Sequence, residues 1–456
     1  MNSEISEIIN AIVQIGGTPF MVGGCVRDTF LGENPKDIDI EVYGVSYESL
    51  NGVLERFGKT DLIGVSFGII KLTTHTGEAY DFSLPRLDSK NGVGHKGFSV
   101  EVNKDLSLKE ASARRDFTIN SMSINMVTGE LVDYYDGKND LRCAWLHPTS
   151  EAFVEDPLRL LRGLQFSARF NMAASAYLIA LSRSEELRKD FNFLPSSRIW
   201  GEWEKWIHKG AHYSKSLKYL MYILPFAYPD IADLAGVLQE PEWHPEGNVL
   251  VHTGFVLDYM GRYCVEHEIT GDRRAILILA ALCHDFGKLT HTQFEDGRIK
   301  SKGHEGASES FARKFLAQIG CPLRFVEPII GLVINHMAAY GRQSEKSVRK
   351  LAFRLSNYNT CIADLAILIE ADKSGRPPLP QGQPESVTQM LQLSANERCR
   401  NGKQAPLISG GAIMDMGYEG PIIGKIQKRL YEMQINGSFT TAETGLWRIK
   451  SFIKQL

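Results

Sequence analysis

Alternating and clustered apolar positions indicate that the first 145 residues of the chain are rich in β-strands. Short runs place Val, Ile, Leu and aromatic residues between Gly, Asp and Asn. Alternation is typical of a strand with one buried face, and Gly and Asp clusters are typical of the turns between strands. We therefore predict the strands of one sheet at residues 21–24, 37–44, 61–65, 67–74 and 79–84.

Helical spacing begins near residue 155 and continues to the C-terminus. In the run 155–170, Leu158, Leu161 and Leu164 recur on one broad face with arginines beside them, which is the pattern of an amphipathic helix. The sequence therefore predicts an α+β chain, in which a mixed sheet with helices is followed by all-α regions.

Proline-rich and glycine-rich segments suggest where the chain divides. Its 456 residues exceed the roughly 250 residues at which single cores stop growing. The pattern changes near residue 145, and Pro and Gly cluster at 239–248 and 376–384, where clustered prolines cannot continue a helix. We predict four parts, at residues 1–145, 146–240, 241–380 and 381–456.

Composition and charge restrict the class of protein. Hydrophobic content of 43% and charged content of 23% are those of a globular protein. No apolar run is long enough to cross a membrane, and the N-terminus carries acids where a signal peptide carries lysines, so we expect a cytoplasmic protein. The 7 cysteines are scattered without a CxxC pair, which argues against a structural zinc site. A net charge of −3 means that any RNA is held by local patches. Nothing in the pattern indicates an oligomeric state.

Two aspartates lie two residues apart behind a double glycine. On a strand, Asp37 and Asp39 would point to the same face. Two carboxylates at such a short distance repel each other unless a cation lies between them. Mg²⁺ is commonly held by one or two carboxylates together with substrate phosphates. The pair therefore predicts a magnesium site. The alternative is an edge strand whose acids are solvated.

The double glycine itself suggests a phosphate site. A short helix after Gly23 and Gly24 would offer backbone N–H groups at its N-terminus, which stabilise a triphosphate. Arg27, which is followed by Asp28, could reinforce that site.

Further charged residues lie in the same part of the chain. Asp81 lies among apolar neighbours, where burying an unpaired acid is costly, so sharing the metal site would explain its presence. Arg114 and Arg115 precede Asp116 and a run that reads as a strand, and two guanidiniums there could clamp a phosphate or ribose. The alternative for the arginines is a solvated basic turn.

Asp156 and Arg159 open the helical part. Pro157 suits a first helical turn, so Asp156 and Arg159 would share a face at i, i+3. The alternative is a helix N-cap with an intrahelical ion pair.

These segments together resemble the class II tRNA nucleotidyltransferases and the related bacterial poly(A) polymerases. The resemblance covers roughly residues 18–210 and rests on the stretches 22–28, 36–40, 113–122, 133–142, 155–170 and 196–206. It implies a polymerase-β-like head, a neck whose Asp156 and Arg159 read the incoming base, and body and tail domains that grip tRNA. The implied reaction is addition of CCA to the tRNA 3′ end from CTP and ATP without a nucleic-acid template.

Base reading by this pair also follows from chemistry. Cytosine and adenine each offer an amino donor next to a ring-nitrogen acceptor, whereas uracil and guanine offer a carbonyl next to an N–H. A carboxylate accepts and a guanidinium only donates, so the pair matches C and A. Against U and G it would leave unmatched polar groups, which cost about 1 to 3 kcal/mol each when buried.

The parts suggest a two-metal mechanism. The 3′-hydroxyl attacks the α-phosphate, with Mg²⁺ lowering the pKa of the hydroxyl and stabilising the pyrophosphate. Asp37, Asp39 and Asp81 would hold the metals, and Arg162 would support Arg159. Gly24, Arg27 and Arg115 would bind phosphate or ribose. The Gly- and Lys-rich run 89–105 resembles the mobile loop that this family uses when specificity changes from C to A, which favours full CCA addition.

A second constellation lies in the helical half. His284-Asp285 ends a long apolar helical run, and a buried ionised Asp is costly unless it is paired or bound to a metal. With His252 and Asp372 the set resembles the HD phosphohydrolase superfamily, and His304 and His336 are candidates to extend it. Such a donor mix suits Mn²⁺, Ni²⁺, Fe or Mg²⁺. The resemblance implies phosphatase or 2′,3′-cyclic phosphodiesterase activity on damaged tRNA ends.

Rival functions share many of these residues. A poly(A) polymerase or A-adding enzyme would keep nearly every residue of the head. An HD phosphohydrolase with a non-catalytic RNA-binding head, or an RNA chaperone, would have no use for paired metal carboxylates. The basic helical segment 421–434 could contact tRNA phosphates, and a solvated helix face is its alternative.

Overall fold

The computed structural model describes residues 3–35, 38–61, 68–90, 98–103 and 105–453. The chain forms two compact units, residues 1–206 with 218–227, and residues 207–217 with 228–456. Each unit is described by itself below.

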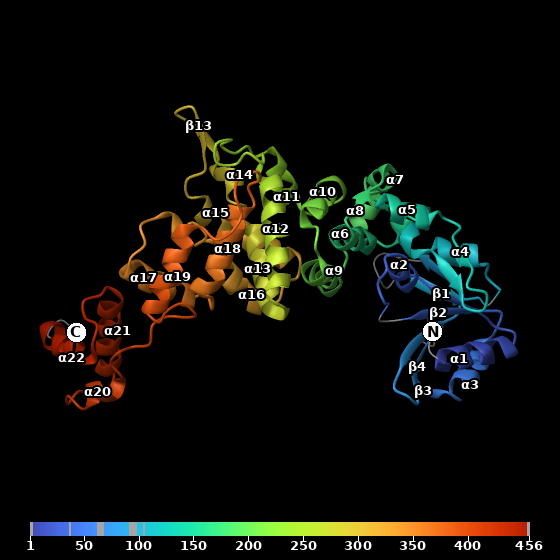
Figure 1. Cartoon of the computed structure of the whole chain (residues 1–456), viewed down its shortest axis with the longest axis horizontal. Helices are drawn as coiled ribbons and strands as arrows, with labels where there is room; N and C mark the ends of the chain where they lie inside the picture. Colours follow the sequence, from blue (N-terminus) through green and yellow to red (C-terminus); the bar gives the residue numbers. More distant parts are fainter. Residues whose placement is uncertain (1–2, 36–37, 62–67, 91–97, 104, 454–456) are drawn as a thin grey trace. The chain divides into compact units, whose positions relative to one another are not determined.

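A mixed sheet forms the centre of the first unit (Figure 1). The strand order is β3-β4-β5-β2-β1-β8-β9, and all neighbours are antiparallel except β2 and β5. The strands are β1 Thr18–Val22, β2 Asp39–Tyr43, β3 Gly58–Asp61, β4 Ile69–Thr74, β5 Ala79–Ser83, β8 Ser123–Asn125 and β9 Leu131–Val132. The sheet confirms the α+β prediction for this part of the chain.

One face of this sheet is buried against α1 (Ser3–Gln14) and α3 (Tyr47–Leu54). Isoleucines at helical spacing along α1 join Ile40 and Val42 of β2 in one core. Alternation along β2 therefore sends Asp39 and Glu41 to the face opposite this core. The short helix α2 (Gly24–Phe30) packs through Cys25 and Val26 in a smaller core.

Three details of the first unit differ from the prediction. The run after Asp116 is a 3₁₀ turn at Thr118–Asn120, and the strand begins only at Ser123, because the segment first wraps around the Asp116 side chain. The strand predicted at 61–65 begins earlier, at Gly58, and residues 62–67 lie outside the described residues. The run 89–105 contributes to two paired strands, β6 Arg86–Lys90 and β7 Phe98–Val102, and its residues 91–97 and 104 are not described.

Helices dominate from residue 158 onward, as predicted. Two short helices precede this region, α4 Leu108–Ala113 and α5 Gly137–Cys143. The helices from residue 158 are α6 Leu158–Phe170, α7 Ala176–Leu181, α8 Glu185–Phe191, α9 Ser196–Lys209, α10 Tyr213–Ile223, α11 Pro229–Asp233, α12 Val249–Glu266, α13 Gly271–Cys283, α14 Lys288–His291, α15 His304–Gln318, α16 Leu323–Val333, α17 Glu345–Ser356, α18 Ile362–Ser374, α19 Glu385–Asn396, α20 Gly410–Met414, α21 Ile422–Ile435 and α22 Ala442–Phe452. A short hairpin, β12 Gln293–Glu295 with β13 Arg298–Lys300, and the two-residue pair β10 Trp145–Leu146 with β11 Ala173–Ala174 were not anticipated.

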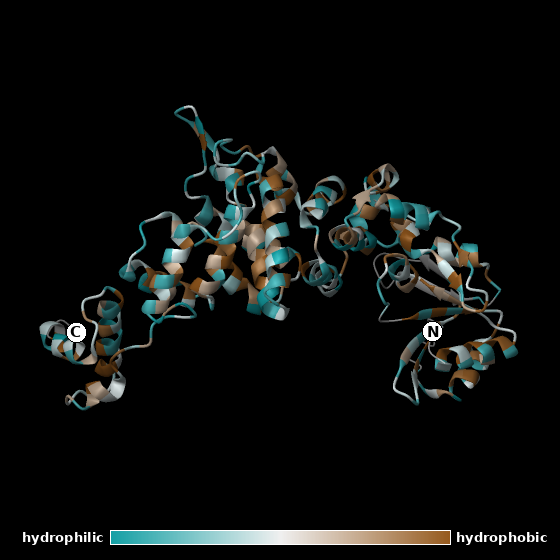
Figure 2. Cartoon of the chain, viewed as in Figure 1, coloured by the Kyte–Doolittle hydropathy of each residue, from teal (hydrophilic) through white to brown (hydrophobic). Residues whose placement is uncertain are grey.

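The second unit is built around α13. Its residues 277–283 are all fully buried, and α12, α16 and α18 pack against it. Figure 2 shows hydrophobic residues concentrated on these central helices. Because α13 ends at Cys283, the residues that follow it emerge from the middle of the core. Across the described ranges, the structure contains no helix long and apolar enough to cross a membrane.

Candidate nucleotidyl-transfer and metal sites

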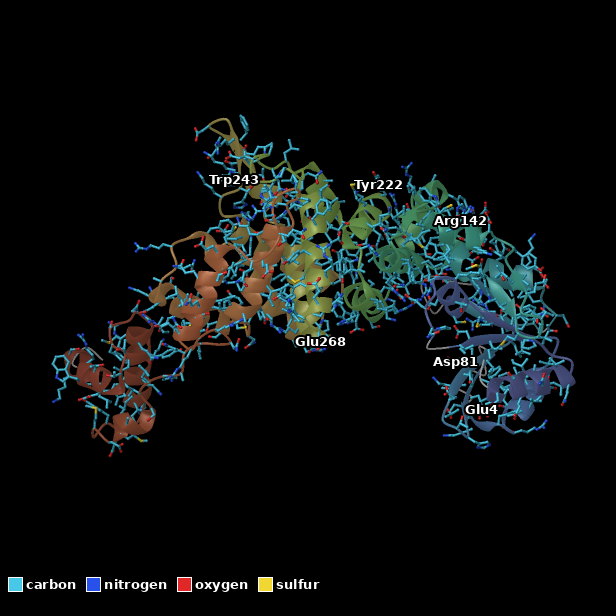
Figure 3. All side chains as sticks on the ribbon, in the orientation of Figure 1. Glu4, Asp81, Arg142, Tyr222, Trp243 and Glu268 are labelled. Atoms are coloured by element: carbon cyan, nitrogen blue, oxygen red, sulfur yellow. The ribbon has the colours of Figure 1, made fainter. Side chains whose placement is uncertain are left out.

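Two aspartates of the first unit lie side by side on neighbouring strands. β2 and β5 are parallel, and their register pairs Asp39 with Asp81, so the two side chains leave the same face of the sheet. Asp39 is exposed, and the Asp81 side chain is 45% exposed and lies 3.9 Å from Nζ of Lys71 (Figure 3). The expectation that Asp81 is buried is therefore wrong, because this face is open, whereas its sharing of a metal site stays a prediction. Asp37 lies outside the described residues.

Gly23 brings a third group to this point. It precedes α2 with φ of 79°, a conformation that favours glycine. A Cβ at this position would lie 2.9 Å from Nη1 of Arg115 and 3.9 Å from Oδ2 of Asp39. The carboxylate, the guanidinium and the glycine backbone therefore meet in one place, as a nucleotide phosphate site requires.

Arg27 lies in a buried network and not at an open surface. Its side chain is 5% exposed, and Nη2 lies 2.6 Å from Oδ1 of Asp28. Nη1 donates to Oδ1 of Asn120 at 2.6 Å. These contacts give Arg27 a role in holding α2 against the turn at Asn120. The same guanidinium packs against Gly24, where a Cβ would lie 3.4 Å from Nη2 of Arg27.

Asp116 and Arg162 form a short ion pair of 2.6 Å. Burial would raise the pKa of Asp116, but the charge of Arg162 and the hydrogen bond from Asn120 outweigh it and hold that pKa below its ordinary value. Arg162 was expected to support Arg159; it binds Asp116 instead, and it thereby ties α6 to the segment that carries Arg114 and Arg115.

Asp156 and Arg159 do not bind each other. Oδ1 of Asp156 accepts a hydrogen bond from the backbone N–H of Leu158 at 3.1 Å, which is a helix-capping contact. The guanidinium of Arg159 donates to the carbonyls of Ala152 at 2.7 Å and Arg114 at 2.6 Å. Separate partners therefore fix the two side chains, and the intrahelical ion pair that sequence allowed is absent between these described residues.

The second unit gathers the residues of the predicted HD set. His252 lies on α12, His284 and Asp285 directly follow α13, and Asp372 lies on α18. Nε2 of His252 is 3.2 Å from Oδ1 of Asp372, and Nε2 of His284 is 3.2 Å from Oδ2 of Asp285. The ligand atoms of His252, His284 and Asp372 lie within 4.8 Å of one another.

The donor atoms of this cluster fit a divalent metal. Nε2 of both His252 and His284 is buried without a hydrogen-bond partner in the described structure, although each lies near a carboxylate. Buried polar atoms are rarely left unpaired, and two imidazole nitrogens with two carboxylates are ligands that transition metals accept. A cation among them would satisfy both nitrogens.

Asp285 also faces a second group. Its Oδ1 lies 3.1 Å from Nε2 of His304, at the start of α15, and 3.8 Å from Nε2 of His336, which follows α16. The two imidazole nitrogens are 3.1 Å apart. Asp285 therefore has one oxygen toward each group of donors, and it would be available as a ligand to a divalent metal held by either group.

A cavity of about 680 Å³ opens onto this cluster. Asp285, His304, His336 and Asp372 form its inner wall. The lining also includes the cations Lys288, Lys302, Lys373 and Arg376, the aromatic residues Trp243 and Tyr340, and the carboxylates Glu240 and Glu305. A phosphate-bearing ligand could therefore reach the cluster.

Comparison with known proteins finds a matching domain family for each of the two regions that carry these sites. A model of the poly A polymerase head domain matches residues 19–147, and a model of the HD domain matches residues 249–372. The chain is 30% identical over 413 residues to the multifunctional CCA protein of Xanthomonas euvesicatoria pv. vesicatoria (strain 85-10). The aligned region covers 85% of this chain and 94% of that protein. The chain belongs to the multifunctional CCA protein family.

Other members of the family, and solved structures, are also similar. The multifunctional CCA protein of Xylella fastidiosa (strain M23) is 29% identical over 84% of this chain and 91% of its own length. The Bacillus stearothermophilus CCA-adding enzyme in complex with CTP has a TM-score of 0.64 at 19% identity and covers 100% of this chain and 99% of that chain. The Thermotoga maritima CCA-adding enzyme complexed with tRNA has a TM-score of 0.57 at 17% identity, and the match covers 99% of this chain and 96% of that chain. These structures share the fold.

Glu41 binds two of the candidate site residues, Arg114 and Arg115, and the sequence analysis did not single it out. Its carboxylate is 1% exposed, receives Nη2 of Arg114 at 2.9 Å and lies 3.4 Å from Nη2 of Arg115. The Tyr43 hydroxyl also donates to it at 2.9 Å; burial, together with this carboxylate, raises the pKa of Tyr43. The two-residue spacing from Asp37 through Asp39 to Glu41 was the available signal.

Two further partners could not be found by spacing. Oδ2 of Asp156 lies 3.2 Å from Nη2 of Arg198 on α9. In the HD part, Oε1 of Glu246 lies 2.8 Å from Nδ1 of His252 and 2.9 Å from Nδ1 of His244. A carboxylate behind a ligand histidine fixes the ring and its tautomer, so Glu246 orients Nε2 of His252 toward the cluster.

Proposed function

We propose that this chain adds CCA to the 3′ end of tRNA from CTP and ATP without a nucleic-acid template. The carrying observation is the in-register pair Asp39 and Asp81 beside Gly23 and Arg115. Membership of the multifunctional CCA protein family supports the same activity. Residues 1–145 would perform transfer, 146–240 would read the base, 241–380 would carry a second activity, and 381–456 would hold tRNA.

In this proposal Asp39 and Asp81, together with Asp37, hold Mg²⁺. Bound there, Mg²⁺ would supply charge stabilisation for an in-line displacement at phosphorus. The bond that forms joins the tRNA 3′-oxygen to the α-phosphorus, and the bond that breaks releases pyrophosphate. Arg115, held by Glu41, faces the triphosphate. Gly23 allows the backbone to approach it without a Cβ in the way.

Base selection is assigned to Asp156 and Arg159. The carboxylate of Asp156 accepts and the guanidinium of Arg159 donates, which suits the amino and ring-nitrogen edge of C and A. Arg198 and the carbonyls of Ala152 and Arg114 pre-position the two groups. The ion pair of Arg162 with Asp116 keeps α6 in a fixed position relative to Arg114 and Arg115.

The second activity proposed is metal-dependent hydrolysis of a terminal phosphate, as a phosphatase or 2′,3′-cyclic phosphodiesterase on RNA ends. His252, His284, Asp285 and Asp372 would hold a divalent metal, which supplies an activated water when bound. His304 and His336 would hold a second metal or the phosphate. Mn²⁺, Ni²⁺, Fe and Mg²⁺ all suit these donors.

The primary activity is tested with tRNA that lacks CCA. We expect CTP alone to give products that end in CC, and CTP with ATP to give products that end in CCA and then stop. A long A tail would instead identify a poly(A) polymerase. Addition of A to tRNA ending in CC, without any addition of C, would identify an A-adding enzyme.

A further inference from the structure

Arg376 differs from the other buried arginines of the described chain. It is 6% exposed and lines the cavity above the HD cluster. Arg27 and Arg349 are about as buried, but each meets a carboxylate, Asp28 at 2.6 Å and Glu397 at 2.7 Å. Arg274 has no carboxylate partner, but it donates to two carbonyls and a hydroxyl.

No carboxylate contacts Arg376 directly in the described structure, although Asp372 interacts with its charge at longer range. Its Nη1 makes one long hydrogen bond of 3.4 Å to the carbonyl of Trp243. Its Nε is buried without a partner, and no carboxylate of the described residues lies within 4.0 Å of the guanidinium. Burying an unpaired charge is costly, so the position favours a bound anion.

The surrounding backbone holds Arg376 at this position. Gly375 packs so closely on α12 that a Cβ would lie 2.8 Å from the backbone nitrogen of Val256. The Gly375 carbonyl also lies 3.2 Å from Nδ1 of His252. The segment that follows Asp372 is therefore fixed against the helix that carries a cluster histidine.

Two neighbours make this place suitable for a nucleotide. Lys373 also lines the cavity, and its Nζ lies 4.1 Å from the centre of the Tyr340 ring. Trp243, whose carbonyl accepts from Arg376, is 55% exposed and lines the same cavity (Figure 3). Exposed aromatic rings are platforms on which single-stranded bases stack, and guanidiniums bind phosphate in a bidentate manner.

We propose that Arg376 and Lys373 bind the phosphodiester that precedes the terminal nucleotide of an RNA chain, with Trp243 stacking the terminal base. The terminal phosphate then lies at the HD cluster, where Lys288 already pairs with Asp285 at 2.8 Å. This inference rests on the proposed second activity. It makes the site selective for polynucleotide ends over mononucleotides.

The test compares two probes on the full chain loaded with Mn²⁺: a dinucleotide with a terminal 3′-phosphate, and a nucleoside 3′-phosphate. Calorimetry should show the dinucleotide binding about tenfold or more tightly, as expected for one charge-assisted contact. Arg376→Gln should remove that advantage and leave mononucleotide affinity unchanged within about twofold. Arg376→Lys should restore part of it. Arg262→Ala, an exposed arginine of α12 outside this cavity, is the matched control.

The outcomes separate this inference from the proposed activity. Equal binding of the two probes by the wild type would contradict the subsite, as would an advantage that survives Arg376→Gln. Equal weakening of both probes would mean that Arg376 contacts the terminal phosphate, which also contradicts it. If the predicted binding pattern is found but neither the 3′-phosphate nor a 2′,3′-cyclic phosphate is hydrolysed, the subsite stands and the hydrolase proposal fails.

Discussion

Asp39 on β2 and Asp81 on β5 are partners in the one parallel strand pair of the described seven-stranded sheet. Their carboxylates leave the face opposite the α1–α3 core, and the Asp39 carboxylate reaches toward the position where Gly23 faces Arg115. Parallel register brings together two acids that are separated by two intervening strands. This relationship gives the head its candidate metal site and explains why β2 carries acids on one face only.

Glu41 should matter for nucleotide binding. Glu41→Gln keeps the shape but removes the charge that holds Arg114 and Arg115, so the arginines should lose their fixed position. We expect KM for CTP and ATP to rise by about tenfold, with a smaller change in kcat. Initial rates at varied nucleotide concentration measure this. Glu48→Gln, on the exposed face of α3, should leave KM unaltered, and an equal effect of both variants would assign Glu41 no role.

The pair Asp156 and Arg159 should determine which nucleotide is used. The double exchange Asp156→Arg with Arg159→Asp reverses acceptor and donor. The ratio of UTP or GTP incorporation to CTP or ATP incorporation should therefore rise by about tenfold. Competition between labelled nucleotides measures the ratio. A variant that is slower but retains the C and A preference would show that the base is read elsewhere. Lys189→Ala, an exposed residue of α8, is the control for the neck.

The two activities should be separable. His284→Ala removes an imidazole nitrogen that points into the HD cluster. The affinity for the divalent metal should therefore fall by about tenfold to a hundredfold or more, and phosphoesterase activity should be lost. CCA addition should persist, because Asp39 and Asp81 lie in the other compact unit. His291→Ala, an exposed histidine outside the cluster, should retain both. Unchanged metal content in His284→Ala would contradict the cluster assignment.

Local spacing predicted much of this molecule, because the relevant contacts are local. Helical spacing along α6 and strand alternation through Asp39 were read correctly, and the apolar run of α13 correctly placed His284 at the end of a buried helix. The HD cluster joins His252, His284 and Asp372 from three separate helical segments, so resemblance to the HD superfamily indicated it and local spacing did not. The α+β fold follows from these periodicities.

Long-range pairing limited the rest. Nothing in the sequence near Asp156 indicates that its partner is Arg198, which lies on α9 beyond three intervening helices. Likewise, Glu246 reaches His252 through a turn rather than along a helix. The openness of the sheet face at Asp81 depends on which strands flank β5. Spacing along one segment does not specify such tertiary choices. The intrahelical ion pair that was the alternative interpretation of Asp156 and Arg159 is replaced by two separate sets of contacts.

The most direct test of the central claim is single-turnover addition of C to tRNA lacking CCA by Asp39→Ala. Addition should fall by about a hundredfold or more, the order expected for removing one transition-state contact, while tRNA affinity in the same preparation stays near that of wild type. Asp61→Ala is the matched control, since that carboxylate lies on β3 of the same sheet and is 44% exposed. Addition by Asp39→Ala within about tenfold of wild type would contradict nucleotidyl transfer at this aspartate pair.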